Sequence, residues 1–299
     1  MIRVSEHPKS EMKAPEPPWR RVYCWKSAVE SVLKDEFKME SDDTISTRHV
    51  PRNVPIGTVG ILFSGGMDST YLAAREMEQG KNVLPIINEI NSDFPVYRLM
   101  TMVALQSLKR KYGHLLQDPY CAINGWRAGM ADKHGLIQQP INIFSLGFMA
   151  RDILEKLESI QAGFVDGDDA LYYVPELRGM YKSVMKISHA IYHPNEKIFR
   201  VPPLKFPLAH TDKKEIYENL KAFGVESLTV SCEDQSDCAV YVNDEITDKP
   251  GKGLIRFAEC GYCHSCHRKG EYGHPLKYID IEFDIRPEHN FYKEIREDA

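Results

Sequence analysis

The sequence predicts an α/β protein built on an open parallel sheet with helices on both faces. Two patterns and the size of the chain support this prediction. From about residue 58 to residue 231, short apolar runs bounded by turn residues alternate with longer segments of helical periodicity. A glycine-rich turn directly follows the first apolar run and precedes a helical segment. The chain has 299 residues, of which 42% are hydrophobic, so it can bury a sizeable core.

Residues 1–55 are predicted to form an N-terminal extension. Within them, the segment "CWKSAVESVLKDEF" places Val29, Val32 and Leu33 on one face of a short amphipathic helix. Proline-rich sequence precedes this helix, and a polar stretch typical of a linker follows it. We therefore expect three parts: the extension at 1–55, an α/β domain at 56–231, and a C-terminal segment with its tail at 232–299.

The elements of the α/β domain are expected in a regular alternation. Strands are predicted at 58–64, 83–87, 162–167, 198–201 and 226–231. Helices are predicted at 71–80, 96–113, 142–161, 177–192 and 212–224. In the last helix, Asp212 is followed three residues later by Glu215, as in a capping box, and Gly224 provides the stop.

Composition narrows the possible classes of protein. The net charge of −5 provides no overall basic field for nucleic acid, so we expect no nucleic-acid partner. No run of 18 apolar residues predicts a membrane span, and the N-terminus lacks the apolar core of a signal peptide. A cytoplasmic location is the resulting expectation. In a reducing compartment, the seven cysteines are expected to be thiols or metal ligands.

The strongest local signal is the turn "FSGGMDST" at 63–70. Two adjacent glycines allow a tight turn and a close backbone approach to a ligand. The N-terminus of the following helix directs N–H groups and a positive dipole at that ligand, which suits an oligophosphate. Asp68 suits a magnesium ion or the helix terminus better than a phosphate. The candidate ATP-binding residues are Phe63, Ser64, Gly65, Gly66, Met67, Asp68, Ser69 and Thr70.

This turn resembles the PP-loop of the N-type ATP pyrophosphatases. The resemblance implies an adenine nucleotide alpha hydrolase-like fold, with Mg²⁺ bound together with ATP. It also implies cleavage of ATP between its α- and β-phosphates and adenylation of a substrate oxygen. The loop alone does not distinguish among the members of that superfamily.

Three cysteines, Cys260, Cys263 and Cys266, recur at intervals of three. A closed structural zinc site needs four ligands, and the candidates for the fourth are Cys232, Cys238, His264 and His267. A bacterial ferredoxin motif would continue with three residues and then Cys-Pro, but Gly270 occupies that position. We therefore expect zinc rather than an iron–sulfur cluster.

The order of these motifs over residues 57–270 resembles the QueC family of 7-cyano-7-deazaguanine synthases. The resemblance implies a structural zinc bound by Cys232, Cys260, Cys263 and Cys266. From "DKKEI" it places Lys213 near the phosphates, so Asp68 and Lys213 are the expected catalytic residues. From "VPELR" and "PIN" it implies that Glu176, Arg178 and Asn142 bind the substrate.

The same resemblance implies a reaction and its partners. The enzyme would use ATP to convert 7-carboxy-7-deazaguanine and ammonia to the nitrile, through an adenylate and an amide, in the queuosine pathway. A homodimer is also implied. The sequence departs from the family around the substrate: "INEINSDFPVYR" replaces Tyr-Gly-Gln-Arg-His, and the arginine of Pro-Gly-Arg-Asn is missing.

Three alternatives remain open at this stage. A related enzyme could stop at the amide or serve deazaguanine modification in phage or defence systems. A tRNA-modifying PP-loop enzyme could use Cys121 or Cys238 as a catalytic cysteine. A scaffold that binds nucleotide for a partner would not be an enzyme.

Overall fold

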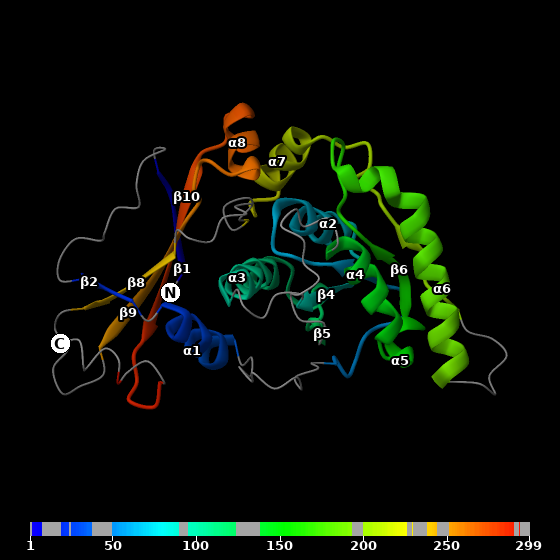
Figure 1. Ribbon diagram of the computed structural model, residues 1–299, viewed down its shortest axis with the longest axis horizontal. Coiled ribbons are helices and arrows are strands. Elements are labelled where there is room, and N and C mark those ends of the chain that lie inside the picture. Colours follow the sequence, from blue (N-terminus) through cyan, green and yellow to red (C-terminus); the bar gives the residue numbers. More distant parts are fainter. Residues whose placement is uncertain are drawn as a thin grey trace. The chain divides into compact units, whose positions relative to one another are not determined.

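The computed structural model describes residues 2–7, 19–23, 25–37, 50–89, 95–123, 138–192, 200–225, 229, 238–243, 251–289 and 293. The chain folds into two compact units (Figure 1). The antiparallel unit comprises Met1–Ser41, Phe94–Val103 and Val230–Ala299, and the parallel unit comprises Asp42–Asp93 and Ala104–Thr229. The three-part division expected from the sequence stays a prediction.

The parallel unit is built on a five-stranded sheet. Its strands are β3 (Thr58–Leu62), β4 (Val83–Glu89), β5 (Tyr120–Ile123), β6 (Leu157–Gln161) and β7 (Leu204–Lys205). They lie in the order β5-β4-β3-β6-β7, and every neighbouring pair is parallel. The predicted open parallel sheet is confirmed.

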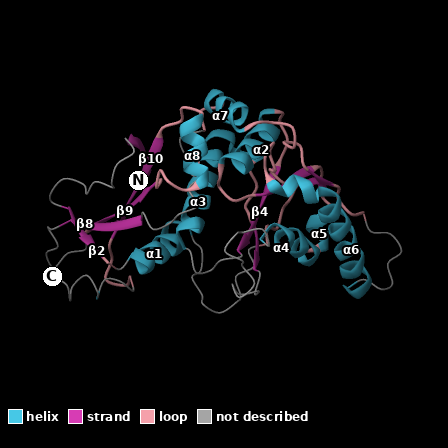
Figure 2. Ribbon diagram, turned by 45° about the horizontal axis from the view of Figure 1, so that its top comes forward, coloured by secondary structure: helices cyan, strands magenta, loops and turns pink. Residues whose placement is uncertain are grey.

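Helices cover both faces of this sheet, and Figure 2 shows them by secondary structure. On one face, a continuous core joins the strands to α4 (Gln138–Ser145), α5 (Arg151–Leu154) and α6 (Val174–Tyr192). On the other face, α2 (Met67–Glu78) packs on β3 and β4 and against α7 (Lys213–Ala222). Helix α3 runs from Pro95 to Tyr112, and its residues are divided between the two units.

The strand order reverses at the boundary between β3 and β6. The chain moves outward from β3 to β4 and β5, and then returns to place β6 on the other side of β3. Ligands of open α/β sheets bind outside the carboxyl ends of the strands at such a switch point. The glycine-rich loop follows β3 directly, so the fold places it at this position.

The helix predicted at 142–161 is wrong in its second half. The structure has α4, then a 3-10 turn (Leu146–Phe148), then the short α5, and Leu157–Gln161 is strand β6. Strand β6 lies inside the sheet with both faces covered, so its burial is almost continuous. A short buried strand cannot be distinguished from a helix by apolar spacing alone, and this is why the periodicity misled.

Several other expectations for strands are corrected. Residues 162–167 are loop and turn rather than a strand, because the strand ends at Gln161. The described residues of the 198–201 prediction are irregular, and the strand lies at Leu204–Lys205 instead. Strand β5 was not predicted from the sequence. The strand predicted at 226–231 falls almost wholly outside the described residues.

The helices of the parallel unit agree well with the predictions from the sequence. Helices α2, α3, α6 and α7 lie where their periodicity placed them. The Asp212 side chain accepts a hydrogen bond from the Glu215 backbone N–H at 2.7 Å, which caps α7 as expected. Gly80 and Gly224 follow their helices with φ of 76° and 66°, a conformation that favours glycine.

The antiparallel unit contains a second five-stranded sheet, in the order β1-β10-β9-β8-β2. Its strands are β1 (Ile2–His7), β2 (Trp19–Val22), β8 (Cys238–Asn243), β9 (Lys252–Ala258) and β10 (Leu276–Asp284). The sequence analysis anticipated none of them. The predicted N-terminal helix is confirmed as α1 (Trp25–Phe37), and α8 (His264–Glu271) packs on β10.

None of the described helices is both long enough and apolar enough to cross a membrane.

A buried carboxylate fixes the C-terminal end of α2. Glu76 is 3% exposed and accepts bonds from Arg75 at 2.9 Å and Lys81 at 3.0 Å. Burial alone would raise the pKa of this carboxyl, but the hydrogen bonds from Arg75 and Lys81 outweigh burial and hold the pKa below its ordinary value.

We predict that Glu76→Gln lowers the free energy of unfolding at pH 7 by about 2–3 kcal/mol, because two cations lose a buried partner. The ionised carboxylate contributes fully above the ordinary glutamate pKa of about 4.3, and its contribution is lost as the pH falls through the lower pKa of the folded state. Urea unfolding of both proteins should therefore show a difference that shrinks below about pH 4. Glu78→Gln is the matched control, because that more exposed carboxylate pairs with Lys111 and should cost under about 1 kcal/mol. Equal losses in the two variants would contradict the prediction.

Candidate functional site

The glycine-rich loop is ordered by its own serines. Gly65 has φ 78°, and Gly66 lies at the N-cap position of α2. The Ser69 hydroxyl accepts a bond from the Ser64 N–H at 3.2 Å and lies 3.2 Å from the Ser64 hydroxyl. Ser69 also donates to the Gly66 carbonyl at 3.2 Å. The loop therefore curves back over the start of α2, where backbone N–H groups and the helix dipole favour an anion.

Asp68 and Lys213 meet at the start of two helices. The Lys213 ammonium lies 2.5 Å from an Asp68 carboxylate oxygen, and the two side chains are 18% and 21% exposed. Asp68 is in the first turn of α2, where its charge suits the helix dipole. Lys213 is the first residue of α7, where a cation opposes the dipole. The two residues singled out from the sequence are thus brought together, 145 positions apart in the chain.

Gly163 is a site residue that the sequence analysis missed. It lies just after β6, across the switch point from the loop. A Cβ atom on Gly163 would lie 3.2 Å from the Asp68 carbonyl carbon and 3.3 Å from the Ser69 nitrogen. The sequence contains one signal for this position, a glycine two residues after the apolar run that forms β6. It was missed because residues 162–167 were predicted to be a strand. The close contact fixes the start of α2 against the end of β6.

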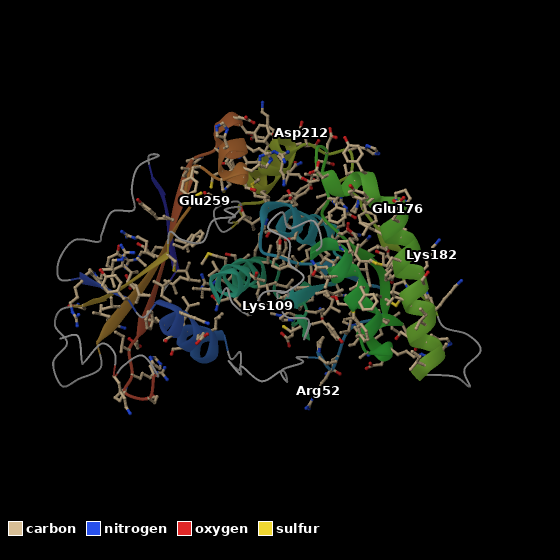
Figure 3. All side chains as sticks on the ribbon, viewed as in Figure 1. Arg52, Lys109, Glu176, Lys182, Asp212 and Glu259 are labelled. Carbon is tan, nitrogen blue, oxygen red and sulfur yellow. The ribbon has the colours of Figure 1, made fainter. Side chains whose placement is uncertain are left out.

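The three candidate acceptor-binding residues lie on the α4–α6 face of the sheet. Asn142 is a half-buried residue of α4, and Arg178 is an exposed residue near the start of α6. Glu176, labelled in Figure 3, is exposed in the first turn of α6. Helices α4 and α6 pack against each other. The guanidinium carbon of Arg178 lies 5.3 Å from the centre of the Phe206 ring. The structure therefore places these residues on one layer of the unit, and their roles stay predictions.

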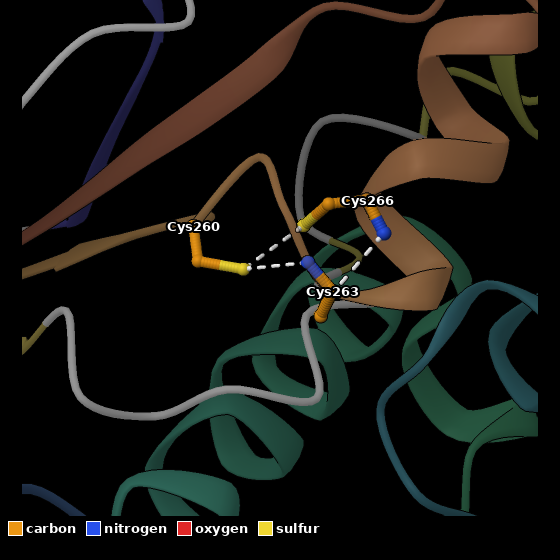
Figure 4. Close-up of side chains that lie close together, drawn as sticks. All are labelled: Cys260, Cys263 and Cys266. Atoms are coloured by element: carbon orange, nitrogen blue, oxygen red, sulfur yellow. Dashed lines mark hydrogen bonds between the residues drawn. The ribbon is translucent and has the colours of Figure 1, made fainter.

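Cys260, Cys263 and Cys266 form a compact cluster in the antiparallel unit (Figure 4). Their three sulfur atoms all lie within 4.8 Å of one another, and those of Cys260 and Cys266 are 3.9 Å apart. Backbone N–H groups of Cys263 and Cys266 donate to the sulfurs of Cys260 and Cys263 at 3.3 Å and 3.5 Å. Soft thiol ligands in this arrangement can hold a metal ion.

Sulfur spacing is informative about the kind of metal site. Four thiolates on one tetrahedral zinc, each at about 2.3 Å, would lie about 3.8 Å from each other. The spacing between Cys260 and Cys266 is close to this value. In an iron–sulfur cubane, each thiolate binds a different iron, which spreads the sulfurs farther apart. The donor set and its spacing therefore fit a single ion.

Three of the four candidates for a fourth ligand lie outside the cysteine cluster that the structure describes. The cluster that the structure describes contains only the three cysteines, so Cys238, His264 and His267 stand outside it. His264 and His267 are exposed on α8, and Cys238 is buried at the start of β8. Cys232, the remaining candidate, lies outside the described residues.

A buried ion pair lies beside the cysteine cluster, and the sequence analysis did not find it. Glu259 precedes Cys260 and Lys269 follows Cys266 by three residues, and the two side chains are 0% and 2% exposed. The Lys269 ammonium donates to one Glu259 oxygen, and the Lys277 N–H donates to the other at 3.1 Å. This carboxylate thus ties the end of β9 to α8 and β10.

Cys238 is unsuited to act as a nucleophile. Burial raises the pKa of its thiol to about 12, which the nearby Arg21 only partly offsets. A thiol that stays protonated near neutral pH attacks poorly. One of the two catalytic cysteines considered for a tRNA-modifying enzyme is therefore disfavoured.

No protein-family model matches the sequence, and no curated protein sequence matches it. Similar solved structures include a 4-thiouridine synthetase–RNA complex with bound ATP, at 18% identity, over 58% of this chain and 42% of that chain, with a TM-score of 0.38. The U34-tRNA thiolase NcsA from Methanococcus maripaludis, with its [4Fe-4S] cluster, matches at 15% identity over 69% and 70%, with a TM-score of 0.35.

A predicted tRNA methyltransferase subunit from Methanocaldococcus jannaschii matches at 15% identity, over 59% of this chain and 93% of that chain, with a TM-score of 0.30. This chain spans less than half the length of the 4-thiouridine synthetase. TM-scores below 0.5 do not define a shared family, so the site is interpreted from its own residues.

We predict that Gly163→Ala weakens binding of a nucleoside triphosphate about tenfold. The added methyl group would shift the first turn of α2 by a few tenths of an ångström, and misplacement of this size impairs a preorganised site. Nucleotide titration by calorimetry measures the effect. Gly179→Ala, where a Cβ meets nothing within 4 Å, is the control. Unchanged affinity in Gly163→Ala would show that this contact does not shape the loop.

We predict that Lys269→Met lowers metal affinity by about 10–100-fold, because it frees the carboxylate that orients the cysteine-bearing segments. Competition with a chromogenic chelator gives the affinity, and elemental analysis gives the metal content. Lys252→Met is the matched control, because Lys252 pairs with Asp284 in the same sheet but both side chains are about 60% exposed. If Lys269→Met bound metal as tightly as Lys252→Met, the ion pair would have no role in the site.

Proposed function

We propose that this protein is an ATP-dependent enzyme that adenylates an oxygen of its acceptor and releases pyrophosphate. The proposal rests on one observation. The N-termini of α2 and α7 meet at the β3–β6 switch point, and Lys213 lies beside the loop. A cation at a helix N-terminus is locally unfavourable, and its presence is explained if a polyanion binds there. The resemblance of the loop to the PP-loop supports the same conclusion.

Each residue of the site has a separate task in this proposal. The N–H groups of the loop hold the phosphates that leave as pyrophosphate, and Lys213 neutralises charge that develops on them. Asp68 offers a carboxylate oxygen, a donor that suits Mg²⁺ bound mainly through nucleotide phosphates and water. Magnesium would supply further neutralisation of the phosphates. Catalysis then depends on placement and electrostatic stabilisation rather than on a dedicated general base.

For the acceptor, we propose 7-carboxy-7-deazaguanine with ammonia as the nucleophile. One carboxylate oxygen attacks the α-phosphorus of ATP, and pyrophosphate leaves. Ammonia then attacks the acyl carbon, AMP leaves, and the amide forms with loss of a proton. A second ATP adenylates the amide oxygen with release of pyrophosphate and one N–H proton, and loss of AMP and of the second N–H proton leaves the nitrile. The order of motifs along the chain supports this carbon–nitrogen ligase, and a product that stops at the amide is the nearest alternative.

We also propose that Cys232 completes a structural zinc site with Cys260, Cys263 and Cys266. Four thiolates would leave no open coordination position, so this metal would not act on substrate. The spacing of the sulfurs and the elimination of three other candidates support the assignment. A visible absorption band typical of an iron–sulfur protein in the purified enzyme would refute it. The family resemblance adds a homodimer to the proposal.

We predict that ATP, Mg²⁺, ammonium and the carboxylic acid together yield AMP, pyrophosphate and a deazaguanine product whose mass identifies it as amide or nitrile. Asp68→Ala and Ser64→Ala should each lower turnover at least about 100-fold, because they disturb the loop that stabilises the leaving group. Liquid chromatography with mass spectrometry measures both nucleotides and products. Glu78→Gln, on the exposed end of α2, serves as the control that keeps activity.

Two outcomes would separate the proposal from its rivals. Acceptor-dependent release of AMP with tRNA, and none with the carboxylic acid, would indicate a tRNA-modifying enzyme. Nucleotide binding without any pyrophosphate exchange would indicate a scaffold rather than an enzyme.

A further inference from the structure

A stack of planar groups lies at the carboxyl edge of β6 and β7 in the parallel unit. The rings of Phe164 and Phe206 lie 5.2 Å apart, with 23° between their planes. The guanidinium carbon of Arg178 lies 5.3 Å from the centre of the Phe206 ring. Phe206 is only 7% exposed, whereas Arg178 is an exposed residue of α6. A cation thus rests against a buried ring whose orientation a second ring helps to fix.

The Arg178 guanidinium has unused hydrogen-bonding capacity. Among the described residues, contact with Phe206 is its sole interaction, and no carboxylate or carbonyl accepts from it. An arginine side chain has many rotamers, and a ring stacked against the guanidinium restricts them before any ligand arrives. Its N–H groups form a planar fork that matches a carboxylate. The stack therefore presents a carboxylate receptor that is already ordered.

Short contacts link this receptor to the phosphate loop. Gly163 lies so near the first turn of α2 that a Cβ atom on it would be 3.2 Å from the Asp68 carbonyl carbon, and the next residue, Phe164, stacks on Phe206. Phe206 follows β7 directly and lies on the chain segment that leads into Lys213. The planar stack is thus anchored at the same edge of the sheet as the nucleotide end of the site.

We propose that Phe206 is a positioning residue that holds the Arg178 guanidinium ready to receive the carboxylate of the acceptor. The acceptor class is a carboxylic acid on a planar heteroaromatic ring, oriented with one oxygen free to attack the α-phosphorus. Phe164 stacks on the Phe206 ring and restrains its orientation. This inference rests on the proposed function.

The amide intermediate provides a sharp test, because it has the same ring but no negative charge. Phe206→Leu keeps the site apolar but removes the flat surface under Arg178. We expect the KM for the carboxylic acid to rise about five- to tenfold, in line with loss of a cation–π contact of about 1–1.4 kcal/mol. The KM for the amide and the KM for ATP should each change by less than about twofold.

Four comparisons make the result specific. Phe206→Tyr, which keeps the ring, should restore the wild-type KM for the acid. Arg178→Lys keeps the charge but loses the planar fork, so the KM for the acid should rise. In the double variant Arg178→Lys/Phe206→Leu, the rise in this KM should be smaller than the product of the two single rises. Phe223→Leu is the matched control, because Phe223 also stacks on a ring and faces a cation, but on the α2–α7 side.

The outcomes distinguish this inference from the proposed function. If the wild-type protein releases no AMP with the acid, both are overturned. If the wild-type protein is active and Phe206→Leu affects acid and amide equally, or neither, then Phe206 is a core residue alone and the inference is overturned.

Discussion

The close contact between Gly163 and the first turn of α2 is the constraint on which the rest of the site depends. It joins the ends of β3 and β6, the two adjacent strands at which the order of the sheet reverses. Without a side chain at Gly163, the loop after β6 can lie against the backbone that is expected to bind phosphate. The same loop continues into Phe164, so one contact sets both the nucleotide end and the aromatic stack. The geometry of the nucleotide end of the site and the geometry of the aromatic stack therefore depend on each other.

Local rules are broken at the places where function is proposed. Lys213 begins a helix although a cation is unfavourable there, and only the Asp68 carboxylate offsets it among the ion pairs described. Arg178 is exposed and holds its guanidinium against a ring instead of a carboxylate. At Glu76, by contrast, the buried carboxylate is paired with two cations, Arg75 and Lys81. Natural sequences concentrate such conflicts where a ligand resolves them.

The sequence was sufficient for features that depend on local chemistry. The glycine-rich loop, the Asp212 cap and the helices α2, α3, α6 and α7 follow from turn residues, capping oxygens and helical spacing. It was insufficient where tertiary burial overrides periodicity, as in β6, whose two covered faces imitate a helical pattern. The antiparallel strands pair residues up to almost 280 positions apart, as Ile2 does with Ile281, and single-sequence spacing carries no record of that register. Glu259 and Lys269 lie ten positions apart on either side of the cysteines, and apolar spacing carries no record of their pairing.

The surroundings of the cysteine cluster argue for a closed metal site. Cys263 is the N-cap residue of α8, where its sulfur accepts from the Cys266 N–H, and Cys266 lies in the first turn of the helix. The one adjacent carboxylate, Glu259, already uses both oxygens, one for Lys269 and one for the Lys277 N–H. It is therefore unavailable to the metal, and no described histidine joins the cluster. A thiolate from another segment of the chain, as proposed for Cys232, would close the site and leave bond-making to the loop after β3.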